Sequence, residues 1–352
     1  MVLKTNHIED AITLAESAAS LHGAPPYVHH VLGEVLLAAG RPADALAPLS
    51  KALASGAAEP AFLQGQAHFA LSRFDDAAAA YRIALDIDPE HSVAANNILP
   101  ALLGSGADEE ALMRANQVLA RTPYQASMLA FKAIALANLG KNDDARALGD
   151  RETLLETGHI TSPSGYASLS DFNAALAVAL QREKDIMYEP PGNATRRGYQ
   201  VRNLGSSTEP AIQMLNSLIM DAARARRDHT LQSGRHPFHR AAPSALKLNA
   251  WAVLIEDGGH QIPHFHPRAW LSGVYYVDVP SEIRSDDPER NEWVIFGRSE
   301  SRWYRPGTAV EEFGLCPEPG LLVTFPSFFW HRTNAMKSAR RRISYAFDIA
   351  PA

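Results

Sequence analysis

The chain has 352 residues, enough for two or three domains, and its 46% hydrophobic content allows real cores rather than disorder. A formal net charge of -6 argues against a nucleic-acid-binding protein, and the single cysteine, Cys316, excludes an intramolecular disulfide. The N-terminus has no apolar signal core and no apolar run reaches the length of a membrane span, so we expect a cytoplasmic protein that does not contact membranes.

Residues 1–156 are predicted to be helical, because apolar residues recur at three- and four-residue steps. Short breakers separate the helical runs at intervals of about 32 to 34 residues, a period typical of helix-turn-helix solenoids. The breakers are Gly40-Arg41-Pro42, Ser72-Arg73-Phe74, Gly104 to Ala107 and Gly140-Lys141-Asn142.

Small residues recur in this region where neighbouring helices must cross closely. The best repeat has Gly65, Ala77, Tyr81, Ala84 and Pro89 at the expected places. Weaker repeats have Gly33, Ala45, Leu49 and Ala52, then Ala111 and Pro123, then Ala133 and Ala145. This pattern resembles the tetratricopeptide family, and a generic alanine-rich helical bundle is the alternative. The resemblance implies an all-α helical-repeat solenoid whose concave groove binds a peptide or protein.

The character of the sequence changes after the repeats. Residues 157–189 are expected to form a linker with one connecting helix, Leu169 to Arg182. Within residues 190–352 a second helix is expected from Pro210 to Arg227, followed by short strands between Gly and Pro turns, which indicate a sandwich or jelly roll. The expected strands are Leu246 to Ile255, Leu271 to Val277, Glu292 to Phe296, Gly320 to Phe325 and Arg342 to Ile349.

The sharpest local feature is the sequence Gln261-Ile262-Pro263-His264-Phe265-His266-Pro267. Two histidines at positions i and i+2 of an extended segment point to the same side, so His264 and His266 can share one metal ion. Alone, this spacing also fits two exposed loop histidines. His260 follows Gly258-Gly259, which disfavours a helix, and we expect it in a loop.

A third histidine and an arginine follow near the C-terminus. His331 ends an apolar stretch and comes after Phe328-Phe329-Trp330, so we expect it in a partly dry place; a core histidine bonded to the backbone is the alternative. Arg342 and Ser344 open the last apolar strand. A buried arginine there needs an anion, and a carboxylate suits its guanidinium group. Alternation along the strand directs Arg341 to solvent.

In combination, these residues resemble the iron(II)- and 2-oxoglutarate-dependent oxygenase superfamily, in which a His-x-Asp/Glu pair, a distal histidine and an Arg-x-Ser motif follow in this order. Further stretches resemble a bacterial and phage subfamily; they are Trp251 to His266, Leu271 to Val277, Phe325-Pro326-Ser327 and Arg342 to Phe347. The resemblance covers about residues 190 to 350 and implies a multidomain chain ending in a double-stranded β-helix (jelly roll) with flanking helices. It also implies a metal held by His264, His266 and His331.

The chain departs from the family at one ligand position, because His266 stands where the family has a carboxylate. Three neutral imidazoles leave the iron site with one more positive charge, and they also suit zinc or copper. Three nearby carboxylates remain alternative ligands: Glu256, Asp257 and Asp278.

The resemblance implies Fe(II) as cofactor, 2-oxoglutarate as co-substrate and dioxygen as oxidant. Arg342 would hold the distal carboxylate of 2-oxoglutarate with help from Ser344, as part of a catalytic set with the three histidines. Tyr275 and Asn249 are further candidates for orienting 2-oxoglutarate or substrate. Other aromatic residues are expected in the core or the pocket wall: Trp270, Trp293, Trp330, Phe328 and Phe329.

The implied function is hydroxylation of an unactivated C–H bond, on a peptide or protein docked by the repeats. One alternative is a three-histidine metal dioxygenase that does not use 2-oxoglutarate. A second alternative is a non-catalytic adaptor in which the barrel is degenerate. Succinate production separates the first two functions, and iron content separates the third.

Overall fold

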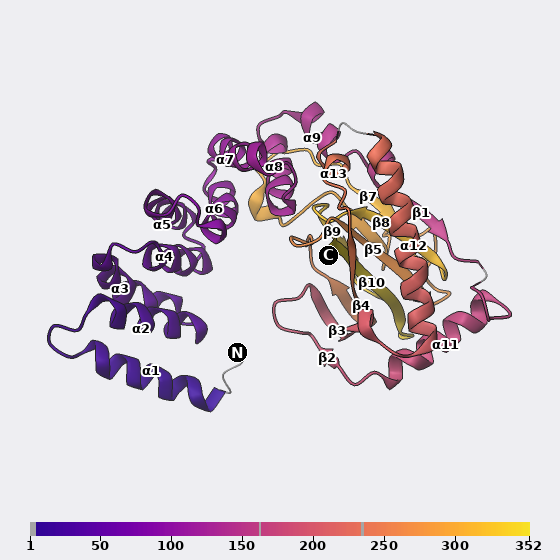
Figure 1. Ribbon diagram of the computed structural model, residues 1–352, viewed down its shortest axis with the longest axis horizontal. Coiled ribbons are helices and arrows are strands. Elements are labelled where there is room, and N and C mark those ends of the chain that lie inside the picture. The colour runs from indigo at the N-terminus through magenta and orange to yellow at the C-terminus, as the bar shows by residue number, and fades with distance from the viewer. Residues whose placement is uncertain (1–4, 162, 234–235) are drawn as a thin grey trace. The chain divides into compact units, whose positions relative to one another are not determined.

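The computed structural model describes residues 5–161, 163–233 and 236–352, and its contacts divide the chain into two compact units (Figure 1). The first unit comprises Met1–Gln117 with the segment Arg302–Arg305, and the second comprises Val118–Ser301 with Pro306–Ala352. The expected repeat region 1–156 is therefore shared between the units, since residues 118–156 pack with the second. Within the described ranges, no helix has the length and apolar character needed to cross a membrane.

The first unit consists of paired helices, which confirms the predicted helical-repeat solenoid. The predicted breakers lie at the turns between the two helices of a pair, and one more such pair, α8 and α9, belongs to the second unit. The helices of all these pairs, including α8 and α9, are α1 (Thr5–Ala19), α2 (Pro26–Ala38), α3 (Pro42–Ala52), η1 (Leu53–Ser55), α4 (Ala58–Ala70), α5 (Phe74–Ile87), α6 (Ser92–Ser105), α7 (Asp108–Arg121), α8 (Ala126–Asn138) and α9 (Asn142–Leu148).

Glycine allows the helices of a pair to cross closely. A Cβ atom added at Gly65 would lie 2.4 Å from ring carbons of the buried Tyr81, and one added at Gly33 would lie 2.4 Å from Leu49. The pattern of small and large residues along the sequence therefore corresponds to real contacts between α4 and α5 and between α2 and α3.

A short segment from the C-terminal half of the chain completes the first unit. Trp303, in η3 (Ser301–Trp303), packs its ring 5.9 Å from that of Phe69 and 5.7 Å from that of Phe74. Arg305 forms an ion pair of 3.0 Å with the buried carboxylate of Asp108. These contacts join residues that lie far apart in the sequence.

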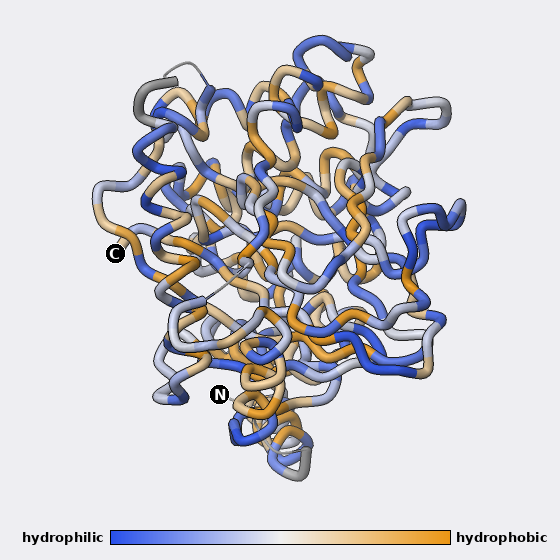
Figure 2. The backbone as a smooth tube through the Cα atoms, turned by 90° about the vertical axis from the view of Figure 1, so that its right-hand side faces the viewer, coloured by the Kyte–Doolittle hydropathy of each residue, from blue (hydrophilic) through white to orange (hydrophobic). Residues whose placement is uncertain are grey.

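The second unit is built on a seven-stranded antiparallel sheet in the order β1-β8-β5-β10-β4-β3-β2. The central strands are rich in buried apolar residues, and hydrophobic and hydrophilic stretches alternate along the backbone (Figure 2). The strands are β1 (Glu156–His159), β2 (Ile186–Tyr188), β3 (Thr195–Val201), β4 (Leu246–Gln261), β5 (Leu271–Asp278), β8 (Leu321–Pro326) and β10 (Arg342–Pro351).

A second sheet lies against this one, with the order β7-β6-β9. Its strands are β7 (Phe313–Leu315), β6 (Val294–Phe296) and β9 (His331–Thr333). An isolated antiparallel bridge adds His264 beside His331, so this sheet has a fourth, minimal strand. Phe325 of β8 packs 4.9 Å from Phe296 of β6, which joins the inner faces of the two sheets. The predicted jelly-roll class is confirmed by this arrangement.

Helices cover the other face of the large sheet (Figure 1). They are α11 (Leu169–Arg182) and α12 (Pro210–Ser233), with the short α10 (Arg151–Leu154), η2 (Leu204–Ser206) and α13 (Pro237–Arg240) nearby. Ser168 caps α11 by accepting a hydrogen bond from the backbone N–H of Asp171. The Tyr345 hydroxyl of β10 donates to Asn216 of α12, so odd-numbered residues of β10 face the helices.

The structure corrects several predicted boundaries. The helix predicted to end at Arg227 continues to Ser233, and the expected linker contributes strands β1 and β2 to the sheet. His260 lies within β4 rather than in a loop, so that expectation is wrong. The strand continues past an irregularity that contains Gly258, whose φ is 74°, because His260 and Gln261 pair with Arg196 and Thr195 of β3.

Candidate metal centre

Backbone pairing brings the three candidate histidines together. The N–H groups of His264 and His331 each donate to the other's carbonyl oxygen at 2.9 Å, which fixes the two residues side by side. His266 is held by a bond of 2.8 Å from its N–H to the carbonyl of Ser327, in the turn that precedes His331. These hydrogen bonds hold together the two segments that carry the rings, residues 264–266 and residues 327–331, although the segments are distant in the sequence.

The rings converge on one point. One ligand nitrogen from each of His264, His266 and His331 lies within 4.8 Å of the others. The centroids of the His264 and His331 rings are 4.1 Å apart, and that of His266 lies 5.3 Å and 5.2 Å from them. Among the described residues, no other group of three or more His, Cys, Asp or Glu residues meets this geometry.

Each ring has one nitrogen committed to an acceptor. Nδ1 of His264 lies 2.8 Å from the carbonyl oxygen of Ile262, and Nδ1 of His331 lies 2.9 Å from that of Phe329. A carbonyl oxygen can only accept, so both Nδ1 atoms must carry the proton, which leaves Nε2 with a free lone pair. Nδ1 of His266 is 2.7 Å from a carboxylate oxygen of Asp348.

The environment keeps the rings of His264 and His331 neutral. Burial, together with the neighbouring His266, lowers the pKa of His264 to about 3. Burial likewise holds the pKa of His331 well below its ordinary range, with both neighbouring rings contributing. Neutral imidazole is the form that binds a metal ion, so the site needs no proton loss from these two residues before loading.

Arg342 is buried at the start of β10 with an incomplete set of partners. Its side chain is 2% exposed, one Nη1–H donates to the carbonyl oxygen of Glu292 at 2.7 Å, and its Nε has no partner. Burial lowers the pKa of this guanidinium, although the nearby Tyr276 and Glu292 oppose the shift. A buried cation with an unused donor is suited to an anion, because it otherwise lacks compensation for its desolvation.

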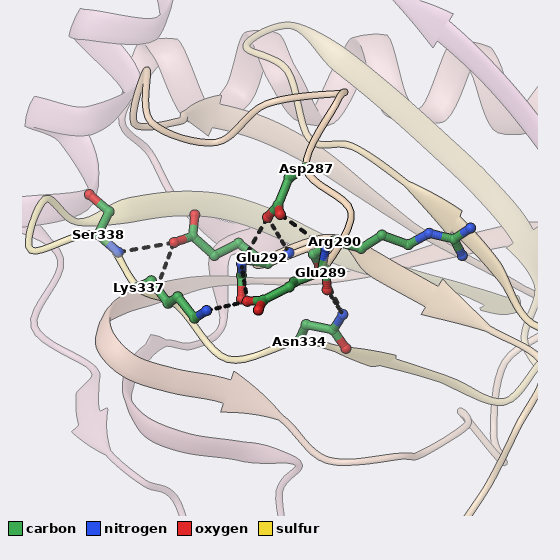
Figure 3. Close-up of polar contacts among 8 residues, drawn as sticks. Asp287, Glu289, Arg290, Glu292, Asn334, Lys337 and Ser338 are labelled. Atoms are coloured by element: carbon green, nitrogen blue, oxygen red, sulfur yellow. Dashed lines mark hydrogen bonds and ion pairs between the residues drawn. The ribbon is translucent and has the colours of Figure 1, made fainter.

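Glu292 fastens the backbone around Arg342. One oxygen of its buried carboxylate accepts the N–H groups of Lys337 and Ser338 at 2.9 and 3.1 Å, and the other oxygen has no partner (Figure 3). Glu292 therefore joins the loop before β6 to the loop before β10, and its own carbonyl oxygen accepts the hydrogen bond from the Arg342 guanidinium. Glu292 itself has φ of 67°, so the strand predicted to begin there begins at Val294 instead.

Comparison with protein families agrees with this geometry. Residues 249–348 match the family described as "Putative 2OG-Fe(II) oxygenase", and residues 2–60, 30–92 and 62–126 match the tetratricopeptide repeat. The chain joins tetratricopeptide repeats to a 2OG-Fe(II) oxygenase-family domain. No curated protein matches the sequence.

Several solved structures align with parts of the chain at low identity. A prolyl-4-hydroxylase from Pseudomonas putida aligns with TM-score 0.39 and 16% identity, over 58% of this chain and 96% of that chain. MamA aligns with TM-score 0.38 and 16% identity, over 43% and 94%. YrrB, a TPR protein with an unusual peptide-binding site, aligns with TM-score 0.38 and 19% identity, over 42% and 76%.

Aromatic side chains pack against two of the three histidines of the oxygenase-family domain. Phe325 meets His331 edge-on at 4.8 Å, and Trp251 stacks on His266 at 5.7 Å. Such walls exclude water and hold the rings in one orientation. As expected, Phe328, Phe329, Trp330 and Trp270 are buried, whereas Trp293 is only half-buried.

The histidine pair is also supported from behind by helix α8. Phe265 lies between the two histidines in sequence, and its ring packs 5.7 Å from Phe131 and 4.8 Å from Trp330. The indole N–H of Trp330 donates to the carbonyl oxygen of Ala130 at 3.2 Å. The last predicted repeat therefore contributes directly to the packing of the segment that carries His264 and His266 within the second unit.

Two candidates for orienting 2-oxoglutarate are placed differently from the rest. Tyr275 points to the helix-covered face, where its hydroxyl donates to Asn173 of α11 at 2.7 Å, so the structure removes it from the candidate site. The next residue, Tyr276, points inward instead and lies near Arg342. Asn249 pairs in register with Asp348 on the inner face of the sheet but is exposed.

The remaining candidates are close to their expected places. The hydroxyl of Ser344, on the same face as Arg342, donates at 3.4 Å to the carbonyl oxygen of Val253. Glu256 forms an ion pair with the exposed Arg341. Of the three carboxylates weighed as ligands, none belongs to the histidine cluster.

The sequence patterns did not indicate two polar residues of the site, Asp348 and Glu292. Asp348 lies an even number of positions after Arg342, so strand alternation alone would have placed it on the same face. No comparable signal marks Glu292, because its role depends on loops that meet only in the folded chain.

Proposed function

We propose that the C-terminal unit is an Fe(II)- and 2-oxoglutarate-dependent oxygenase that hydroxylates an unactivated C–H bond. The observation that carries this proposal is the meeting of three imidazoles, each with Nδ1 already engaged, in a fold that also buries an incompletely paired arginine. These residues fit both groups: imidazole nitrogen suits iron, and the free guanidinium donor suits a carboxylate.

The chain's own residues would each perform a limited task. His264, His266 and His331 would hold Fe(II) through Nε2 while their Nδ1 bonds keep the rings from rotating. Arg342 would bind the distal carboxylate of 2-oxoglutarate, with Ser344 beside it. When bound, iron with 2-oxoglutarate and dioxygen supplies the oxidising chemistry. The aromatic wall would exclude water from the reacting centre.

We further propose a peptide or protein side chain as the substrate. Support comes from the tetratricopeptide repeats, since stacked helical repeats form an extended concave surface suited to a polypeptide. The test is oxidation of a panel of peptides in the presence of Fe(II) and 2-oxoglutarate, followed by mass spectrometry for the gain of one oxygen atom. Turnover of free metabolites with no peptide modified would contradict this part of the proposal.

The binding of 2-oxoglutarate by Arg342 can be tested with the neighbouring Arg341 as a control. Calorimetry of 2-oxoglutarate binding to the iron-loaded protein under anaerobic conditions compares the parent with Arg342→Ala and with Arg341→Ala. We expect Arg342→Ala to weaken binding about 10- to 100-fold through loss of charge-assisted hydrogen bonds, and the exposed Arg341→Ala to leave it unchanged. Equal binding by all three proteins would refute the role of Arg342.

Turnover is tested by succinate release, with His331→Ala as the variant that removes one ligand. We expect this variant to abolish succinate production, and undiminished production would refute the assignment of the centre. The all-imidazole ligand set also favours a second candidate, a metal dioxygenase that does not use 2-oxoglutarate. Oxygen consumption without succinate would select that function.

A further inference from the structure

The carboxylate of Asp348 lies directly behind His266. Its Oδ1 is 2.7 Å from Nδ1 of His266, on the side of the ring opposite Nε2. The same oxygen accepts a hydrogen bond of 2.6 Å from the hydroxyl of Ser272, which in turn lies 2.8 Å from that of Ser327. Both members of the His266–Asp348 pair are largely buried, with side-chain exposures of 13% and 17%.

Several elements hold this carboxylate in place. Asp348 is on β10 and pairs in register with Ser272 of β5, so the hydroxyl that binds it comes from the directly opposite residue. Ser327 completes the link, because its carbonyl accepts the backbone N–H of His266. The ring and the carboxylate are therefore positioned by one connected network, which leaves little freedom for His266 to turn.

This arrangement distinguishes His266 from the other two histidines. His264 and His331 donate to neutral backbone carbonyls, whereas His266 donates to a carboxylate. A carboxylate partner makes the opposite ring nitrogen a stronger ligand than a carbonyl partner does. His266 is also the residue that stands at the position where the resembling oxygenases carry a carboxylate ligand.

We propose that Asp348 is a positioning residue that supplies, through His266, the negative charge that the metal centre lacks among its direct ligands. A divalent ion with three neutral imidazoles retains a charge of about +2, and one carboxylate, whether direct or one hydrogen bond away, reduces the total to about +1. The carboxylate of Asp348 thus lies one imidazole ring beyond the position proposed for the ion. This inference rests on the proposed metal centre.

The test separates the charge of Asp348 from its ability to accept a hydrogen bond. Asp348→Asn keeps an acceptor oxygen for His266 and Ser272 but removes the charge, and Asp348→Ala removes both. Glu256→Gln is the matched control, since it removes a carboxylate of the same unit that is paired with an exposed arginine. Affinity for Co(II) alone is measured by chelator competition, and the visible spectrum of bound Co(II) reports the ligand geometry.

We expect Asp348→Ala to weaken Co(II) binding about 10- to 100-fold and to change the spectrum. Asp348→Asn should bind with intermediate affinity and a spectrum close to that of the parent, because the ring keeps its orientation. With iron, Asp348→Asn should also raise the Fe(III)/Fe(II) midpoint potential, since losing a negative charge favours the reduced ion. A purely structural role for Asp348 would not move this potential.

Each outcome bears on a different claim. If the parent and both Asp348 variants bind Co(II) equally, the inference is overturned while the metal centre stands. If Asp348→Ala fails to fold, the asparagine variant decides, and an unchanged affinity together with an unchanged iron potential would overturn the inference. If the parent itself binds no Co(II), the proposed metal centre falls and takes the inference with it.

Discussion

Acidification of the metal-free protein should destabilise the second unit through its buried histidines. Burial lowers the pKa of His264 to about 3, against an ordinary value of 6.5. Below pH 6.5 the unfolded chain binds a proton at this residue that the folded chain does not bind. The unfolded state is therefore favoured as pH falls, and the loss of stability develops between pH 6.5 and about pH 3.

The size of the effect follows from the pKa difference. At about pH 5 the ring is largely protonated in the unfolded chain and neutral in the folded chain. This pH lies roughly 1.5 units below the pKa of the unfolded ring, and the unfolded state is favoured by the free energy of protonation over that interval. Each unit is worth about 1.4 kcal/mol, so His264 alone should cost about 2 kcal/mol relative to pH 7. His331 has its pKa lowered in the same direction and should add to this loss.

Urea unfolding in the presence of a chelator, followed by tryptophan fluorescence, measures this loss at pH 7 and at about pH 5. Trp251, Trp270, Trp293 and Trp330 all lie in the second unit, so the signal reports mainly on it. In His264→Gln the difference between the two pH values should shrink by about 2 kcal/mol.

An exposed histidine supplies the control for this experiment. His229→Gln should show the same difference between the two pH values as the parent, because this side chain is exposed on α12 of the second unit. If His264→Gln loses as much stability on acidification as the parent does, burial does not keep this ring neutral and the reasoning fails.

Three further predictions concern other parts of the chain. Gly65→Ala should destabilise the first unit by about 1–2 kcal/mol in thermal unfolding, because the added methyl would meet Tyr81 at 2.4 Å and this overpacking exceeds the gain in helix propensity. Trp330→Phe should cost about 1–3 kcal/mol in urea unfolding, because the smaller ring leaves unfilled space at a buried position and the carbonyl oxygen of Ala130 loses the indole N–H that it accepts besides its helical partner. Glu292→Gln should tighten 2-oxoglutarate binding about threefold or more in calorimetry, because a negative charge near Arg342 is removed while an acceptor for two backbone N–H groups is kept.

Each of these predictions has a result that would contradict it. An increase in the midpoint temperature of Gly65→Ala would show that the helices separate easily. Trp293→Phe, which removes an exposed indole hydrogen bond to Arg284, is the control for Trp330→Phe, and equal losses in the two variants would contradict the argument from burial. Weaker 2-oxoglutarate binding by Glu292→Gln would mean that the negative charge of Glu292 supports the binding of the anion.

Local patterns in the sequence determined most of the secondary structure and the fold class. The helix predicted at Leu169–Arg182 agrees with α11, and the repeat signature around Gly65 and Tyr81 corresponds to a real contact between helices. Helices and long strands have periodicities of 3.6 and 2 residues, which any sufficiently long segment displays by itself. Strands of three residues, such as β2, β7 and β9, are too short to display a period and exist because a partner strand pairs with them.

The composition of the site was decided at the tertiary level. The sequence marked the three histidines and Arg342 by their spacing, yet it could not tell Tyr275 from Tyr276, because neighbouring residues of a strand face opposite sides and the inner side is chosen by pairing with β10. Asp348 is likewise an ordinary strand residue until the register sets it opposite Ser272 and behind His266. The spacing of residues along a strand determines which side chains share a face of the sheet. Only the packing of distant strands determines which residues that face contacts.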